Sequence, residues 1–366
     1  MLVRALHIKA WLVTRYDDVL TVLKDERFAK DISSTMRWLP GFARPLTQHM
    51  LNRDPPDHTR LRALATKAFS AGRIEKLRSR IEQVCEELLA AAPRNEPFDL
   101  LRGYALPIPL TVIADLLGIP GRDRLRFHSL VRGSLPLAAP TGVMDIPVAL
   151  SYFWFLIRYF RKLIADHRAH PQDDLVSALV EAEEAGDQLD EGELLSTVLL
   201  LLSAGYETTV NLIASGALAL LQHPEQRELF VRDPAVAEPA VEELLRFTSP
   251  VEIVLPRLAR EEITLASEKI RQGELVAAVL GSANRDESKF PDPDVLDLTR
   301  EPNKHVAFGQ GAHFCLGAHL ARLEGQIALT TLFRQYPNLR LAQPAEKLRW
   351  RKLLPLRGLE ELPVVT

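Results

Sequence analysis

The chain has 366 residues, of which 47% are hydrophobic and 25% are charged, an ordinary composition for a globular protein. Its net charge of -3, without a dense basic stripe, gives no reason to expect nucleic-acid binding. Two cysteines cannot build a disulfide framework, so we expect a cytoplasmic protein. The most apolar windows, residues 151–157 and 194–204, are too short to cross a bilayer, so we expect no membrane span.

The first part of the chain is predicted to hold a strand, a helix and a long loop. Residues 10–14 read as a strand and residues 17–23 as a helix. Residues 31–53 have no clean period and are broken by prolines, which is typical of a functional loop. The helix that follows places His58 and Arg62 on one face. Two cationic donors there suit a carboxylate ligand, and a solvated helix face is the alternative interpretation.

Helices dominate the next hundred residues. Residues 73–91 form a predicted helix in which Cys85 has core spacing, so we assign that cysteine to packing. Helices are also predicted at residues 107–117 and 122–131. Residues 133–160 are apolar and aromatic but are interrupted by three prolines. This segment is either core beneath a loop or a mobile apolar lid over a ligand.

Residues 193–221 are predicted to form one long helix that is apolar nearly all round and therefore runs through the centre of the protein. The middle of this helix departs from its apolar pattern. Gly205 costs about 1 kcal/mol in a helix interior relative to alanine. Glu207 and Thr208 place an acid and a hydroxyl within an apolar helix, and such breaks mark functional sites. A solvent-facing polar patch at a kink is the alternative.

The remaining elements before the second cysteine are short. Glu243 and Arg246 are three residues apart on a predicted helix and can pair, although such pairs are commonly surface features. Residues 249–257 are β-branched and are predicted to cross a pocket as a strand. Further strands are predicted at residues 263–265 and 275–278. We expect one folded unit of mostly helices with a small sheet.

The segment 308–317 holds the second cysteine, Cys315, behind Gly309 and Gly311. Helical spacing over residues 316–333 places this cysteine at the mouth of a helix. The positive end of the helix dipole favours a thiolate there, which is the form that binds metals. A small buried hydrophobic residue is the alternative interpretation of a free cysteine.

Other uses of this loop are less well supported. A zinc site needs about four ligands, and only His313 is near Cys315. A dinucleotide fingerprint needs a glycine where Phe314 stands. A catalytic thiol with His305 or His313 as base stays open, whereas one thiolate is what haem iron uses, because the porphyrin supplies the equatorial donors. The cations available to neutralise the haem propionates are His58, Arg62, Arg257 and His313.

Four motifs in this order make the chain resemble the cytochrome P450 family, specifically its soluble bacterial class. They are His58-x-x-x-Arg62, Ala204-Gly-x-Glu-Thr208, Glu243-x-x-Arg246 and Phe308-x-Gly-x-x-His313-x-Cys315-x-Gly317. The resemblance implies a mainly α fold with small β-sheets, in which haem b is buried between the long central helix and the helix after the cysteine loop. It implies a single domain over residues 1–366, with an N-terminal segment shorter than is usual in the family.

The resemblance also implies residue roles. Cys315 is the expected iron ligand, and Glu207 with Thr208 the expected proton-delivering pair. Glu243 and Arg246 are expected to support the haem pocket. The other expected haem contacts are His58, Arg62, Gly205, Arg257, Phe308, Gly309, His313 and Gly317, and the expected substrate contacts are Tyr206, Val251, Ile253 and Val254. Tyr206 narrows the pocket in one interpretation and faces away from it in another.

The implied activity is a haem-thiolate monooxygenase that inserts one atom of dioxygen into a hydrophobic small molecule. NAD(P)H takes part only indirectly, through a ferredoxin or flavodoxin-type donor with its reductase. Arg300, Lys304 and Arg322 are the expected contacts for that donor. A peroxide-driven peroxygenase and a non-enzymatic haem sensor are the alternatives, and the acid–alcohol pair argues against the first.

Overall fold

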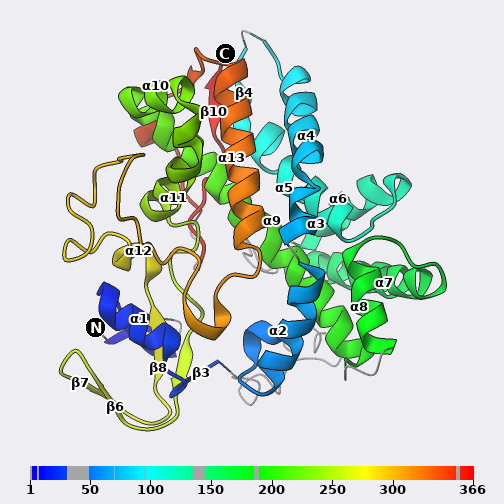
Figure 1. The fold of residues 1–366 in the computed structure, drawn as a ribbon, viewed down its shortest axis with the longest axis vertical. Coiled ribbons are helices and arrows are strands. Elements are labelled where there is room, and N and C mark those ends of the chain that lie inside the picture. The colour runs from blue at the N-terminus through cyan, green and yellow to red at the C-terminus, as the bar shows by residue number, and fades with distance from the viewer. Residues whose placement is uncertain are drawn as a thin grey trace. The chain divides into compact units, whose positions relative to one another are not determined.

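The computed structural model describes residues 2–5, 8–30, 49–69, 71–94, 96–134, 145–184, 189–351 and 355–366. By its internal contacts the chain separates into two units. Unit 1 comprises residues 1–32, 71–109 and 206–366, and unit 2 comprises residues 33–70 and 110–205. Figure 1 colours the chain from blue at the N-terminus to red at the C-terminus. The single domain expected over residues 1–366 stays a prediction.

Unit 1 contains the strands that the described residues form. They are β1 (Leu2–Ala5), β2 (Ile8–Val13), β3 (Phe28–Ala29), β4 (Phe98–Asp99), β5 (Arg257–Ala259), β6 (Ile263–Leu265), β7 (Glu268–Ile270), β8 (Leu275–Ala278), β9 (Arg340–Leu341) and β10 (Pro363–Val365). One sheet has the order β1-β2-β8-β5-β3, in which only β2 and β8 run parallel. A second has the order β4-β10-β9, and the third pairs β6 with β7.

The helices of unit 1 pack against these sheets and against one another. They are α1 (Tyr16–Lys24), α3 (Ala71–Glu75), α4 (Arg78–Ala90), η4 (Leu101–Ala105), α10 (Pro224–Arg232), η7 (Pro234–Val236), α11 (Ala237–Thr248), α12 (Leu280–Ala283), η8 (Gly311–His313), α13 (Ala318–Gln335) and η9 (Ala345–Lys347). Val19, Phe28, Val276 and Phe290 belong to one buried cluster that joins α1 to the largest sheet. Burying each such side chain contributes about 1.5–3 kcal/mol.

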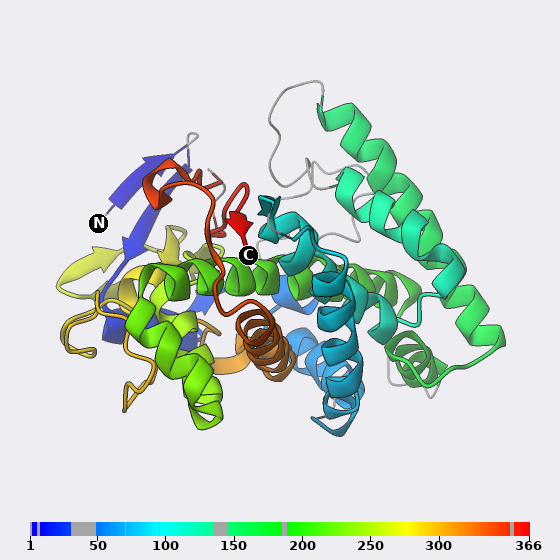
Figure 2. The same cartoon turned by 90° about the horizontal axis from the view of Figure 1, so that it is seen from above.

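The described part of unit 2 is helical. It contains η3 (Met50–Asn52), α2 (Asp57–Ala68), η5 (Gly121–Asp123), α6 (Arg124–Ser134), α7 (Asp145–Ala169) and α8 (Leu175–Glu184), and α5 (Pro107–Leu116) starts in unit 1 and ends in unit 2. Figure 2 shows α6 and α7 side by side, and Phe127 of α6 makes ring contacts with Tyr159 and Phe160 of α7. The buried His167 ring lies 2.8 Å from the Asp174 carboxylate, and this contact joins α7 to the start of α8.

The long helix α9 (Glu191–Gln222) confirms the prediction for residues 193–221 and extends it at both ends. Its 32 residues are about 48 Å long at 1.5 Å per residue. By length and composition alone this helix is able to cross a membrane, so the expectation that its apolar run is too short was wrong. However, 72% of its most apolar window is buried inside the protein, as in a core helix.

The segment 249–257 does not form the strand that its composition predicts. Val251 and Ile253 make only isolated bridges, and β5 begins at the last residue of the segment. Pro250 and Pro256 explain the difference, because proline has no N–H to donate to a ladder.

Two other predictions change in detail. The helix predicted over residues 73–91 is divided into α3 and α4 by a turn at residues 76–77. Within the proposed lid, residues 145–160 are not a loop but the first part of α7, whose Pro147 lies in the first turn, where no donor is lost. Residues 135–144 of that segment and residues 31–48 of the long loop lie outside the described residues.

Candidate active site

The loop before α13 is fixed by its own backbone. The Cys315 N–H donates to the Phe308 carbonyl at 2.9 Å. Gly309 and Gly311 have φ values of 69° and 76°, a left-handed conformation that is strained for residues with a Cβ. α13 begins at Ala318, two residues later than predicted, so the half-buried cysteine stands just before the helix N-terminus as expected.

Gly311 is required for a second reason. A Cβ at this position would lie 2.8 Å from the carbonyl oxygen of Leu23 near the end of α1. Real Cβ atoms essentially never come that close, and the neighbouring atom is backbone, which has no alternative rotamer. α1 therefore supports the cysteine loop directly, and any side chain at position 311 would displace the loop.

Glu242, Arg322 and His305 form a hydrogen-bonded network behind the loop. The Glu242 carboxylate accepts hydrogen bonds from Arg322 at 2.6 and 2.8 Å and from the His305 ring at 3.1 Å. Burial opposes ionisation of Glu242, but these hydrogen bonds outweigh it and lower its pKa to about 2. The Arg322 guanidinium also lies 4.6 Å from the centre of the Phe308 ring, a cation–π contact. Hydrogen bonding to Glu242 raises the pKa of Arg322, and the charge of Cys315 acts in the same direction.

Glu243 and Arg246 of α11 form a fully buried ion pair, which confirms that they pair. Arg246 donates to the two Glu243 carboxylate oxygens at 2.7 and 2.8 Å, and both side chains are 0% exposed. The same guanidinium donates to the carbonyls of Asn284 at 2.9 Å and Pro293 at 2.8 Å. The surface-pair alternative is therefore wrong, and the pair anchors the irregular segment that precedes the cysteine loop.

Sequence reasoning missed two further members of this network. Arg300 and Asn303 also donate to the Glu243 carboxylate, at 3.2 and 3.1 Å. The Arg300 side chain is only 9% exposed, so its prediction as a contact for an electron donor was wrong. The sequence carries no signal for either contact, because Arg300 and Asn303 follow Glu243 by 57 and 60 residues and no local spacing connects them.

The middle of α9 is accessible to solvent, whereas the residues before and after it are buried. Residues 194–202 and 209–220 are buried throughout, whereas Ser203 and Ala204 are exposed and Glu207 and Thr208 are partly exposed. An opening in the middle of an otherwise buried helix is what a ligand-binding helix requires. The polar residues of the predicted motif lie at this opening.

Glu207 has a cationic partner that the sequence did not indicate. Arg351 donates to its carboxylate at 2.9 Å. Arg351 is itself fixed, since its N–H donates to the Gly358 carbonyl at 2.8 Å and its Nε to the Leu359 carbonyl at 3.0 Å. Burial raises the pKa of Glu207, and the Arg351 charge partly offsets this rise. A raised pKa keeps the acid protonated nearer to neutral pH, as proton delivery requires.

Within unit 1, α9 and α13 pack directly against each other at two levels. A Cβ on Gly325 would lie 2.9 Å from the Leu212 side chain, and one on Gly216 would lie 3.3 Å from the Leu329 side chain. Both contacts have the same sequence offset (325 − 212 = 329 − 216 = 113), so the two helices run parallel there.

One turn nearer the start of both helices, this packing ends. The same offset pairs Thr208 with Ala321, yet both residues are partly exposed. Cys315 and Gly317, just before α13, are also partly exposed, and nothing lies within 4 Å of a Cβ built on Gly317. The two helices therefore leave room between them at the level of the cysteine loop.

The four predicted propionate contacts are distributed over both units. His58 is buried and Arg62 half-buried on one face of α2, and burial together with the Arg62 charge lowers the pKa of His58. Arg257 is buried at the start of β5, and His313 is half-buried at the end of η8. Their role toward propionates stays a prediction.

The residues predicted to line the substrate pocket differ in burial. Tyr206 is 4% exposed and burial raises its pKa, which favours the interpretation that it faces away from the open side of α9. Val251, Ile253 and Val254 are half-buried in the extended segment before β5. Cys85 is buried, and burial raises its pKa to about 12, so its assignment to packing is confirmed.

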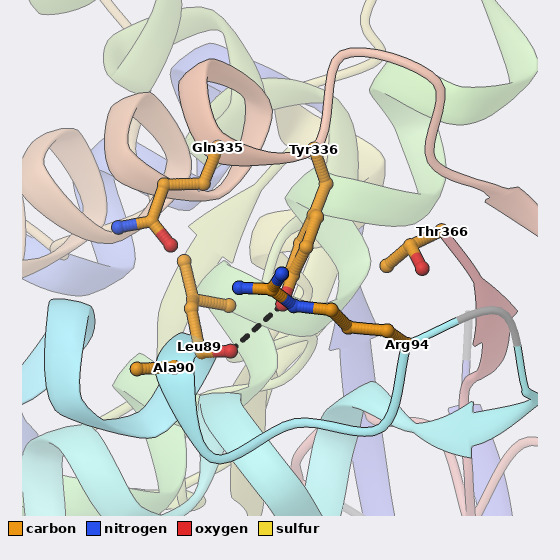
Figure 3. Close-up of a pocket in the computed structure, with 6 residues that line it drawn as sticks. All are labelled: Leu89, Ala90, Arg94, Gln335, Tyr336 and Thr366. Atoms are coloured by element: carbon orange, nitrogen blue, oxygen red, sulfur yellow. Dashed lines mark hydrogen bonds between the residues drawn. The ribbon is translucent and has the colours of Figure 1, made fainter.

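A separate hollow of about 490 Å³ lies where the ends of α4 and α13 meet the C-terminus (Figure 3). The Tyr336 hydroxyl donates to the Leu89 carbonyl at 2.7 Å on its wall. The hollow is lined by Leu89, Ala90, Arg94, Gln335, Tyr336 and Thr366. None of the residues predicted for haem, proton delivery or substrate belongs to it.

Comparison with known proteins identifies the family. The model of the family described as Cytochrome P450 matches residues 235–353, which include Glu243, Arg246 and Cys315. The protein named Cytochrome P450 107B1 of Saccharopolyspora erythraea is 46% identical over 98% of this chain and 89% of its own length. The chain belongs to the cytochrome P450 family.

Solved P450 structures confirm the fold. The polyketide synthase P450 named PksS of Bacillus subtilis has a TM-score of 0.92 and 42% identity, covering 100% of this chain and 92% of its own. P450BioI, solved in complex with an acyl carrier protein ligated to hexadec-9Z-enoic acid, has a TM-score of 0.90 and 38% identity, covering 100% and 94%. The predicted mainly α fold with small sheets is thus the P450 fold.

Membership of the family establishes the reaction class. The protein is a P450 monooxygenase, an oxidoreductase that uses haem and dioxygen to hydroxylate or epoxidise a small molecule. P450 enzymes of this kind receive electrons from redox partners.

The residues present fit a haem group. Among the described residues, no group of three His, Cys, Asp or Glu side chains is placed to hold a metal ion. A metal at Cys315 would therefore depend on a macrocycle for its other donors, as haem iron does. Gly317, beside which a Cβ would meet nothing within 4 Å, and the partly exposed Glu207 and Thr208 of α9 leave the space that a flat macrocycle needs.

Proposed function

We propose that Cys315 is the proximal ligand of haem b, held between α9 and the start of α13. One observation carries this proposal. A half-buried cysteine is fixed by a backbone hydrogen bond at the level where the two helices stop packing against each other. The residues that would hold the haem are Phe308, Gly309, His313 and Gly317 of the cysteine loop and Gly205 of α9. The cations that would neutralise its propionates are His58, Arg62, Arg257 and His313.

The roles of the chain's own residues follow from their surroundings. Bound haem supplies the iron that activates dioxygen. Arg322 stabilises the negative charge of the Cys315 thiolate through space, and the Glu242 network keeps that guanidinium in place. On the other side, the Thr208 hydroxyl orders water at the opening of α9. The Glu207 carboxylic acid supplies the proton to that water, and Arg351 holds its carboxyl group in position.

We further propose that the substrate is an acyl or polyketide chain. PksS belongs to a polyketide synthase and P450BioI was solved with a fatty acyl chain on its carrier protein, and both resemble this chain over all of its length. Val251, Ile253 and Val254 are apolar, half-buried and suited to the wall of such a pocket. Tyr206 contributes through packing behind that wall rather than by contact.

The electron donor is proposed to be a ferredoxin or flavodoxin-type protein in the cytoplasm, which draws electrons from NAD(P)H through its reductase. It approaches the face of the cysteine loop. Lys304 is exposed beside that loop and Arg322 is partly exposed, so both remain suited to contact an acidic donor. Arg300 has no part in this contact.

The carbon monoxide spectrum of the reduced, haem-loaded protein tests the assignment of the ligand. Wild-type protein and the control Cys85→Ala are expected to show the red-shifted Soret band of a thiolate-ligated haem. Cys315→Ala is expected to lose this band, because no other thiol is available to the iron. A band like that of a histidine-ligated globin in the wild type would contradict the proposal.

Turnover separates the alternatives for the reaction. We expect product with ferredoxin, reductase and NAD(P)H and much less with hydrogen peroxide alone, because Glu207 and Thr208 deliver protons to dioxygen chemistry. Faster turnover with peroxide would indicate a peroxygenase. A spectral response to ligands without any turnover would indicate a sensor.

A further inference from the structure

The outward faces of η5, α6 and α7 carry an unusual concentration of uncompensated positive charge. Six cations are exposed there and form no ion pair with a carboxylate among the residues that the structure describes; they are Arg122, Arg126, Arg132, Arg158, Arg161 and Lys162. We call them the basic face. By contrast, Arg124 pairs with Asp115 and Arg168 pairs with Glu183. The whole chain has a net charge of -3, so the basic face is not a consequence of basic composition.

The cations of η5 and α6 lie close to α7, the helix that carries the other three, because α6 and α7 pack together. Arg158 and Lys162 are four residues apart, and Arg158 is exposed on the same side of α7 as Phe155. Burial raises the pKa of Tyr159 in α7 to about 12, and the positive charges of Arg126 and Arg122 oppose that rise. The guanidinium groups of η5 and α6 therefore stand close to α7. Asp123 and Asp166 are the carboxylates whose charges also reach this tyrosine, so the cations remain in excess.

Large apolar side chains are exposed beside the cations. Trp154 and Phe155 of α7 are 41% and 46% exposed and form an edge-to-face ring pair, and Arg158 lies 4.8 Å over the Trp154 ring. Val148 and Leu125 are also exposed, one on α7 and one on α6. Exposed aromatic residues bordered by arginines are the composition of a protein interface rather than of an ordinary surface.

We propose that the basic face docks a negatively charged carrier domain that presents the substrate as a thioester. This proposal rests on the proposed function, because it names how an acyl or polyketide chain reaches the P450. The six cations of the basic face favour an acidic partner and speed its association, while Trp154 and Phe155 offer apolar anchors to a helix of that partner. Docking leaves the thioester intact, and the monooxygenase reaction acts on the attached chain.

The test measures binding of an acyl carrier protein loaded with a hexadecenoyl chain to the haem-loaded enzyme at low and moderate salt. The triple variant Arg126→Glu, Arg161→Glu and Lys162→Glu is expected to bind at least about tenfold more weakly, which is about 1.4 kcal/mol. Its dissociation constant is also expected to depend less on salt, because the steering charges are reversed. The second variant, Phe155→Ala, removes an anchor without changing charge and is expected to weaken binding with an unchanged salt dependence.

A matched control makes the same change of charge elsewhere. Lys76, Arg340 and Lys347 are exposed cations of unit 1 outside the basic face, and changing all three to Glu is expected to leave carrier binding within about twofold of wild type. Equal weakening by the control and the test variant would show a general charge effect and overturn the proposal.

Free hexadecenoic acid distinguishes failure of docking from failure of the proposed function. If the free acid causes a spin-state shift and is oxidised, but the carrier-loaded chain binds no better and the charge reversal has no effect, the docking proposal is overturned and the monooxygenase assignment stands. If the wild type shows no thiolate band and oxidises neither form, the proposed function itself fails. The triple variant is also tested with reduced ferredoxin and with anionic lipid vesicles. If it binds one of these more weakly than the wild type does but binds the loaded carrier equally well, the carrier proposal is overturned and the basic face belongs to that other partner.

Discussion

Arg246→Ala removes the centre of the buried network on α11. The guanidinium makes two bonds to Glu243 and donates to the carbonyls of Asn284 and Pro293, all with no exposure to solvent. Truncation leaves the Glu243 charge buried with Arg300 and Asn303 still donating to it, and breaking such a pair costs about 3–5 kcal/mol. The unfolding entropy of a 366-residue chain is about 0.8 kcal/mol/K, so the melting temperature should fall by about 4–6 °C.

Differential scanning calorimetry of the haem-loaded protein measures this loss, and absorbance at the Soret band follows haem release in the same experiment. Arg285→Ala is the matched control. Arg285 also pairs with a carboxylate and donates to the Phe247 carbonyl at 2.8 Å, but its side chain is 30% exposed and its partner Asp294 is 86% exposed. We expect that control to cost about 1 kcal/mol, or about 1 °C. Equal losses in the two variants would refute the argument that burial makes the contribution of the Glu243 network to stability large.

Three further substitutions test the groups on α9 and α13. Arg351→Leu removes the positive charge that holds down the pKa of Glu207, so that pKa should rise further; the alkaline fall in product formed per NAD(P)H should move to higher pH, and Arg351→Lys should leave it in place. Thr208→Ala should divert reducing equivalents into peroxide, and an unchanged yield of product per NAD(P)H would show that its hydroxyl has no part in proton delivery. Glu324 is fully buried, its Oε2 has no hydrogen-bond partner among the described residues, and burial raises its pKa well above 4.5. The folded state therefore keeps a proton that the unfolded chain releases, and wild-type stability falls as pH rises from 4.5 toward the folded pKa, whereas Glu324→Gln lacks this loss. The variant's stability relative to wild type should grow by up to about 1.4 kcal/mol per pH unit in that window, and parallel pH profiles in urea unfolding would contradict it.

The features that sequence reasoning predicted are those encoded by local spacing. The long helix, the pairing of Glu243 with Arg246 and the position of Cys315 before a helix each depend on residues within one or a few turns. The prediction of a strand over residues 249–257 was wrong, because two prolines outweighed the β-branched composition of this segment. Haem contacts remain predictions because they require a group that the sequence does not contain.

The features that sequence reasoning missed join residues that are far apart in the chain. Arg351 follows Glu207 by 144 residues, and Arg300 follows Glu243 by 57. No periodicity connects such positions, and a cation is common enough that any of many arginines is an equal candidate from sequence. The docking prediction for Arg300 failed for the same reason, because its side chain was already committed to a buried acid.

The contact between Gly311 and Leu23 has a consequence for the evolution of new activities. Position 311 lies in the cysteine loop and would be an obvious target for a mutant library, yet the backbone of α1 excludes every side chain larger than hydrogen there. Substitution at position 311 is therefore expected to yield mostly unfolded or haem-free clones. Diversity is better directed to Val251, Ile253 and Val254, which are half-buried and are proposed to line the substrate pocket. Position 311 therefore has to stay glycine, whereas the proposed pocket positions are free to change.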